Sequence, residues 1–160
     1  MNIYLIRHGD AEKISIGKKD SDRELTPSGR IKLQSAVINW KNLIKDLDSI
    51  ITSPLARAVQ TANIIAEVYG AGDKIIIDKK LSPGSRTESI IEIANSLNGL
   101  EIAFVGHQPD LSEILSDLIS PKAAYIDFKK GAIAKVSFGN KAGMARGTLE
   151  FLIPVSVFNS

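Results

Sequence analysis

The chain opens with the stretch that decides its fold, Met1-Asn2-Ile3-Tyr4-Leu5-Ile6-Arg7-His8-Gly9-Asp10-Ala11-Glu12. The apolar run at 3–6 predicts a short buried strand, which ends in a cation, an imidazole and a glycine. Open α/β sheets bind their ligands beyond the carboxyl ends of the strands. An imidazole there can be a nucleophile, a base or a metal ligand, and a guanidinium suits a phosphate or a carboxylate. The stretch therefore predicts a functional site at Arg7 and His8.

The composition is that of an ordinary soluble globular protein. The 160 residues suggest one domain spanning 1–160, with 44% hydrophobic and 24% charged residues. A net charge of +2 gives no overall field that favours nucleic acid or a membrane surface. The lack of cysteine excludes disulfides, thiolate catalysis and cysteine-based zinc sites. Without a secretory signal or an apolar run of about 20 residues, we expect a cytoplasmic protein.

Short strands alternate with helices over residues 1–119. Further strands are predicted at 48–52, 74–78 and 101–106. Helices are expected to begin at Thr26-Pro27, Ser53-Pro54, Thr87 and Asp110, where a capping side chain or a proline suits the first turn. The first two helices carry buried stripes at helical spacing, namely Leu33, Val37, Trp40 and Ile44, then Ala58, Ala62, Ile65 and Tyr69.

The last part of the chain no longer alternates strand and helix. Two strands are predicted at 132–138 and 148–153, and the turn-rich segment between them indicates a hairpin. Together the elements predict an α/β fold, a three-layer α/β/α sandwich whose mostly parallel sheet ends in an antiparallel C-terminal hairpin. The polar segment 9–25 directly follows the proposed site. It is either a flap over the site or a solvated surface loop.

Four side chains stand at corresponding strand ends: Arg7, His8, Arg57 and His107. Because parallel strands place their carboxyl ends at one edge, all four are expected to meet in one crevice. The set includes both histidines of the chain. Arg57 is expected in the first turn of a helix, where a cation is unfavourable for the helix but helps to hold an anion.

These residue types indicate phosphoryl chemistry. Arginines and helix N-termini suit a dianion, and each charge pair is worth about 4 kcal/mol before desolvation. A neutral imidazole can attack phosphorus and form a covalent phosphohistidine, while the second imidazole donates a hydrogen bond to the phosphoryl oxygens. No metal is required. The alternative, His8 and His107 as metal ligands, lacks a set of carboxylates at ligand spacing.

The chain resembles the histidine phosphatase superfamily, of phosphoglycerate mutase-like fold. The resemblance rests on Leu-Ile-Arg-His-Gly at 5–9, Ser-Pro-Leu-Ala-Arg-Ala-Val-Gln-Thr-Ala at 53–62 and Val-Gly-His at 105–107. It implies that His8 is the phosphorylated nucleophile and that Arg7, Arg57 and His107 bind the phosphoryl group. It also implies that no cofactor is needed.

Within the superfamily the chain looks most like the short phosphohistidine phosphatases of the SixA type. The matching features are Arg-His-Gly-Asp-Ala at 7–11, Asp-Arg-Glu-Leu-Thr-Pro-Ser-Gly at 22–29, and the small size without an inserted cap. This resemblance adds Arg23 as a phosphate ligand. It implies a phosphohistidine-bearing signalling domain as the partner.

One departure from the superfamily concerns the general acid. Phosphomonoesterase and mutase branches usually carry a glutamate, or an aspartate after the second histidine, whereas this chain has Leu-Ser-Pro-Gly at 81–84 and Gln108 after His107. An alkoxide leaving group needs a proton, worth about 10²–10⁴-fold in rate, and an imidazole leaving from an N–P bond needs it less. The departure favours phosphohistidine, or another phosphoramidate, over sugar phosphates, although Asp10, Glu12 and Glu88 remain candidate acids.

Three alternatives stay open. The chain could be a small-molecule phosphomonoesterase or, less well supported, a mutase; or it could be a non-catalytic phosphate-binding scaffold. Lys129 and Lys130 form either a rim for an acidic partner or a solvated turn. No heptad pattern indicates an assembly, so a monomer is expected.

Overall fold

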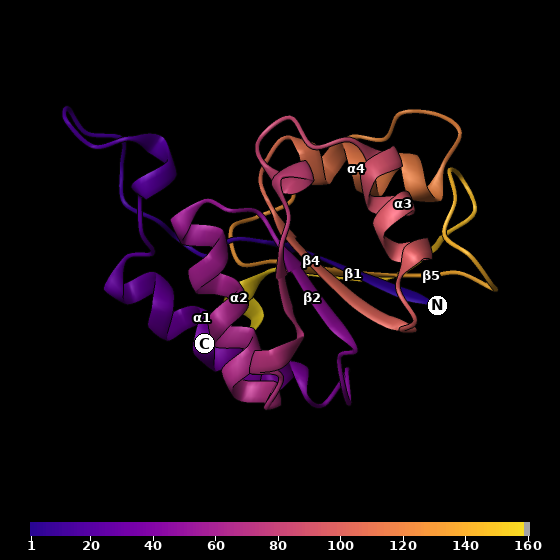
Figure 1. Cartoon of the computed structure of the whole chain (residues 1–160), viewed down its shortest axis with the longest axis horizontal. Helices are drawn as coiled ribbons and strands as arrows, with labels where there is room; N and C mark the ends of the chain where they lie inside the picture. The colour runs from indigo at the N-terminus through magenta and orange to yellow at the C-terminus, as the bar shows by residue number, and fades with distance from the viewer. Residues whose placement is uncertain (159–160) are drawn as a thin grey trace.

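The computed structural model describes residues 1–158 and contains one six-stranded sheet in the order β3-β2-β4-β1-β5-β6 (Figure 1). The first four strands are parallel, and β5 and β6 are antiparallel to their neighbours. Their bounds are β1 Asn2–Arg7, β2 Ser49–Thr52, β3 Ile75–Ile77, β4 Glu101–Gly106, β5 Ile133–Ser137 and β6 Thr148–Ile153. The predicted parallel sheet and C-terminal hairpin are confirmed.

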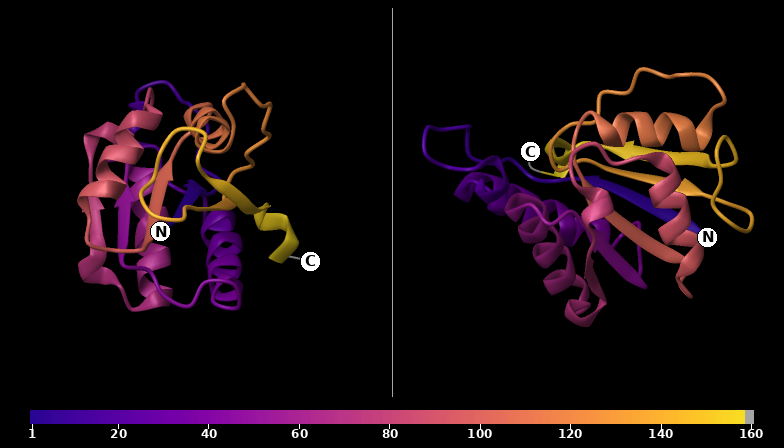
Figure 2. Two further views of the ribbon diagram at one scale, coloured as in Figure 1. Left: turned by 90° about the vertical axis from the view of Figure 1, so that its right-hand side faces the viewer. Right: turned by 45° about the horizontal axis from the view of Figure 1, so that its top comes forward.

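Helices cover both faces of this sheet (Figures 1 and 2). Helices α1 (Pro27–Trp40) and α2 (Ala56–Tyr69) pack on one face, and α3 (Thr87–Ser96) and α4 (Asp110–Ile119) pack on the other. Among residues 1–158, no helix is both long enough and apolar enough to cross a membrane.

Strand β1 shows why the first stretch is continuously apolar. Ile3 and Leu5 belong to the core under α3 and α4, while Tyr4 and Ile6 belong to the core under α1 and α2. All four side chains are at most 2% exposed. A strand covered on both faces has no solvent-facing positions, so it needs no polar alternation.

Two of the predicted helix starts are confirmed. Thr26 caps α1, since its hydroxyl accepts a hydrogen bond from the Gly29 N–H at 2.9 Å, and Asp110 is the first residue of α4. Along the predicted stripes, Ile44 is buried but lies beyond the end of α1, and Tyr69 is half-buried at the end of α2.

The other two predictions are wrong about the capping residue, although a helix does begin at Thr87. Thr87 is the first residue of α3 rather than its cap, because its hydroxyl donates to the Asp117 carboxylate of α4 at 2.6 Å. Helix α2 begins at Ala56, and Ser53 directly follows β2. Ser53 is fully buried, which frees its hydroxyl for a contact in the site described below.

The strand register aligns the ends of β1, β2 and β4. Arg7 is paired with Gly106, and Thr52 is paired with Val105. The residues that follow, His8, His107 and Ser53, therefore leave the sheet at the same edge.

Candidate active site

His8 lies buried immediately after β1, with 7% of its surface exposed. Its Nδ1 is 2.8 Å from the Gly9 carbonyl oxygen. Because a carbonyl only accepts, Nδ1 carries the hydrogen and Nε2 carries the lone pair. Burial, above all, lowers the pKa of His8 to about 3, and the nearby His107, Arg57 and Arg7 act in the same direction. At neutral pH, His8 is an uncharged imidazole with Nε2 as its basic atom.

Arg57 is the second residue of α2 and is 5% exposed. Its Nε–H donates to His8 Nε2 at 3.3 Å. The hydroxyl of Thr61, one turn further along α2, accepts from the Gly9 N–H at 3.2 Å and donates to the Arg57 carbonyl at 2.8 Å. One buried hydroxyl therefore ties the turn that holds His8 to the helix that holds Arg57.

His107 follows β4, and its ring centroid lies 5.3 Å from that of His8. Its Nε2 is 2.7 Å from the Ser53 hydroxyl, which already accepts from the Leu55 N–H at 3.3 Å. The serine hydrogen is thus available for Nε2, and we assign the ring hydrogen to Nδ1. Within residues 1–158, that Nδ1 is buried and has no partner. It is a free donor beside the proposed nucleophile.

The charge balance around His107 favours its neutral form. Burial and the Arg57 cation lower the pKa of His107 to about 4, against the opposing effect of the Asp110 and Asp20 carboxylates. Asp110 itself accepts from the N–H groups of Gly84 and Ser85 at 2.8 and 3.0 Å. Across the described chain, no three His, Cys, Asp or Glu residues are grouped so that they could hold a metal ion.

Two further arginines border the histidines. Arg7 donates to the Phe128 carbonyl at 2.8 Å, and its buried Nε has no partner within residues 1–158. Arg23 comes from the segment between β1 and α1, where its Nε donates to the Glu12 carbonyl at 2.7 Å. The structure thus gathers all five predicted site residues: Arg7, His8 and His107 from the ends of β1 and β4, Arg57 from the first turn of α2 and Arg23 from the segment beside them.

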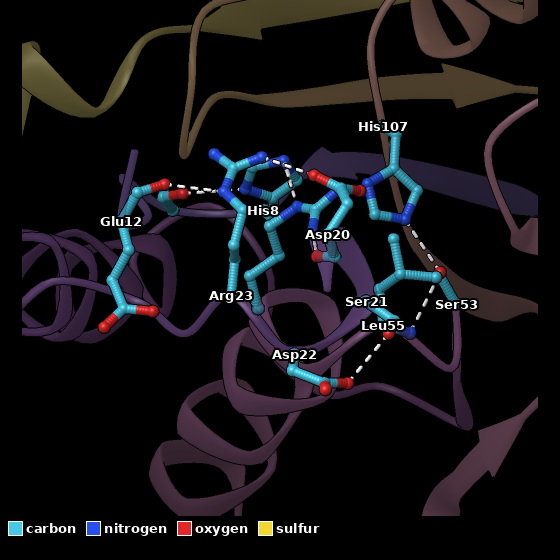
Figure 3. A network of polar contacts seen from close by, with 11 residues as sticks. His8, Glu12, Asp20, Ser21, Asp22, Arg23, Ser53, Leu55 and His107 are labelled. Carbon is cyan, nitrogen blue, oxygen red and sulfur yellow. Dashed lines mark hydrogen bonds and ion pairs between the residues drawn. The ribbon is translucent and has the colours of Figure 1, made fainter. Parts of the chain in front are cut away.

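Asp20 is a site residue that the sequence did not reveal (Figure 3). It begins the 3₁₀ turn η1 (Asp20–Asp22), and its carboxylate accepts from Arg23 Nη1 at 2.6 Å and from Arg57 Nη2 at 3.0 Å. Its carbonyl oxygen also accepts from Arg57 Nη1 at 2.7 Å. The only signal in the sequence is an acid three residues before Arg23, a spacing common on protein surfaces.

Two of the three candidate acids, Asp10 and Glu12, are poorly suited to hold a proton. An ion pair with Lys130 at 2.7 Å lowers the pKa of Asp10, and an ion pair with Lys18 lowers the pKa of Glu12. Glu88 lies exposed on α3. Both acids nearest in sequence to His8 are therefore ionised at neutral pH.

The proposed lysine rim is also engaged. Lys130 pairs with Asp10, and Lys129 pairs with Asp127 at the surface. Each lysine has a neighbouring carboxylate, so the interpretation as a solvated turn is favoured over a basic surface for an acidic partner.

Comparison with known proteins agrees with this geometry. A model of the histidine phosphatase superfamily (branch 1) matches residues 3–85, more than half of the chain. An uncharacterized protein of Picosynechococcus sp. is 29% identical over 150 residues, which cover 91% of this chain and 88% of that protein. A phosphohistidine phosphatase SixA homolog of Haemophilus influenzae is also 29% identical, over 89% of this chain and 92% of its own.

Among solved structures, the protein histidine phosphatase SixA complexed with tungstate superposes with a TM-score of 0.84. It is 20% identical and covers 98% of this chain and 99% of its own, which establishes the fold. Sheet order, helical layers and the site at the strand ends define an α/β protein of phosphoglycerate mutase-like fold. The chain belongs to the histidine phosphatase superfamily.

Proposed function

We propose that the protein is a phosphatase that works through a covalent phosphohistidine on His8. The observation that carries this proposal is the state of His8: a buried, neutral imidazole whose Nε2 lone pair lies beside Arg57 and His107. A nucleophile of this kind needs no base to activate it, because it carries no proton that must first be removed.

The reaction follows in two balanced steps. His8 Nε2 attacks phosphorus, and the bond from phosphorus to the leaving group breaks, with its electron pair going to the leaving atom. Water then attacks the phosphorus, its proton is lost to solvent, and the N–P electron pair returns to Nε2 as phosphate forms. Arg7, Arg23 and Arg57 hold the phosphoryl oxygens in this scheme, and the free Nδ1–H of His107 donates to them as charge builds up.

We infer that phosphohistidine is the substrate group. The nearby carboxylates Asp10 and Glu12 are ionised by their lysine partners and offer no proton to an alkoxide. An imidazole leaving group takes its proton from water or carries it beforehand, so it tolerates a site without a general acid. The name of the Haemophilus influenzae relative points the same way. The proposed partner is a phosphohistidine-bearing protein domain, and we propose a cytoplasmic monomer that needs no cofactor.

Phosphate release from a phosphohistidine peptide and from p-nitrophenyl phosphate, measured side by side, tests this proposal. The wild-type protein should turn over the peptide faster, and His8→Ala should turn over neither. Faster turnover of the ester would indicate that the protein is a small-molecule phosphomonoesterase instead. If neither substrate reacts, the choice of substrate stays open and the alternative of a phosphate-binding scaffold gains support.

A further inference from the structure

The anion site proposed above already holds an anion from the protein itself. Asp20 presents three oxygens to the two arginines: one carboxylate oxygen to Arg23, the other to Arg57, and its carbonyl oxygen to Arg57 as well. A phosphoryl group likewise offers three oxygens to surrounding donors. The Asp20 negative charge also reaches His107, since it raises the pKa of that imidazole.

We propose that Asp20 is an internal competitor for the phosphoryl site, which a substrate must displace and which returns as product phosphate leaves. The inference rests on the proposed function, because it takes Arg57 and Arg23 as phosphoryl ligands. A dianion carries twice the charge of a carboxylate, so it exchanges favourably for Asp20 at the same two guanidinium groups.

The segment that carries Asp20 is built to allow this exchange. Its base is fixed, since Ala11 bridges to Leu25 and the Glu12 N–H donates to the Glu24 carbonyl at 2.9 Å. Beyond that base, η1 contains no buried residue, and the Asp20 side chain is half exposed. Withdrawal of Asp20 would therefore break two ion pairs without uncovering any core.

Competition of this kind lowers the apparent affinity for every oxyanion. If Asp20 occupies the site about nine-tenths of the time, the measured dissociation constant is about tenfold weaker than the intrinsic one. Removal of the carboxylate should restore the intrinsic value. A purely structural carboxylate predicts the reverse, because loss of its ion pairs would leave Arg23 and Arg57 less ordered and weaken binding.

Calorimetric titration with inorganic phosphate distinguishes the two roles. Asp20→Asn and Asp20→Ala should each bind phosphate about 3- to 10-fold more tightly than the wild-type protein. Asp22→Asn is the matched control, because it removes the same charge from η1. The Asp22 carboxylate accepts from the Ser21 hydroxyl, whereas the Asp20 carboxylate accepts from the two arginines. This control should bind within about twofold of wild type.

The proposal is wrong if neither Asp20 variant binds phosphate more tightly than Asp22→Asn does. Thermal unfolding of each variant checks that the fold is intact. The readout is independent of substrate choice: a protein that fails to hydrolyse phosphohistidine overturns the proposed function, whereas an unchanged or weakened phosphate affinity in the Asp20 variants overturns this inference.

Discussion

The site is assembled from two regions with opposite physical character. The sheet edge supplies His8, Arg57 and His107, each at most 7% exposed and each fixed by buried hydrogen bonds. The segment between β1 and α1 supplies Asp20, from a short 3₁₀ turn without buried residues, and Arg23, which directly follows that turn. It projects from the body of the molecule in Figure 1, and its Ile14 and Ile16 side chains are exposed.

This difference suggests that the sheet edge carries out the chemical step, whereas the segment controls binding and release of the phosphoryl group. A buried edge holds the imidazoles neutral and the donors aligned, which bond-making requires. An exposed segment whose Asp20 carboxylate is half exposed can exchange partners at little cost, which binding and release require. On this view, substitutions at the edge should reduce the rate strongly, and substitutions in the segment should mainly alter affinity.

The largest effect is expected for His8→Ala, because it removes the proposed attacking atom. Turnover of a phosphohistidine peptide should fall by at least about 10³-fold. Mass spectrometry of protein mixed with substrate should find a phosphorylated wild-type chain and none for the variant. His107→Ala is the matched control, since these are the chain's two histidines, and it should still become phosphorylated, only slowly. A phosphoryl group found on His107 instead would show that His107, and not His8, is the nucleophile.

The next prediction compares the two regions directly, by measuring kcat/KM for Arg57→Met and for Arg23→Met. Arg57 is buried against His8, and its loss removes a fixed donor, so kcat/KM should fall about 10²–10³-fold. Arg23 acts from the exposed segment, and its loss should cost about 2- to 5-fold, mostly in KM. Equal losses in the two variants would mean that the segment is as much a part of the chemistry as the sheet edge.

The sequence predicted the sheet edge far better than the segment, for a physical reason. Parallel strands carry whatever follows them to one edge, so His8, Arg57 and His107 could be brought together from topology alone. The contact of Asp20 with Arg57 joins residues 37 positions apart and depends on how a polar segment folds back. No periodicity specifies such a path.

Ser53 and Thr87 show a second limit of sequence reasoning. Both have the residue type of a helix cap, and both use their hydroxyls elsewhere, toward His107 and Asp117. A hydroxyl at a helix start has several possible partners, and tertiary packing chooses among them. Thr26 caps α1 as predicted, because its hydroxyl accepts from the Gly29 N–H at 2.9 Å while it donates to the Asp10 carboxylate at 3.3 Å.

A smaller effect is expected for Ser53→Ala, which leaves the reacting groups in place but frees the His107 ring. Loss of one buried hydrogen bond should lower kcat by about tenfold with little change in KM. The ¹⁵N chemical shifts of the ring provide the decisive readout. The wild-type ring should be protonated at Nδ1, and the variant should show a mixture of both neutral forms. An unchanged tautomer would mean that Ser53 does not position the ring.

The smallest expected effect concerns the pKa values of His8 and His107, which report how far the sheet edge is shielded from water. The folded-state pKa values of His8 and His107, about 3 and about 4, lie below the value of about 6.5 for an unfolded chain. Their NMR ring signals should therefore stay unchanged between about pH 8 and pH 5, whereas in urea both should titrate near pH 6.5. Because the unfolded state binds more protons across this window, the free energy of unfolding should fall as the pH drops from about 6.5 toward about 4. Titration of either folded imidazole near pH 6.5 would mean that water reaches the sheet edge freely. The contrast between a buried sheet edge and an exposed, exchangeable segment would then be wrong.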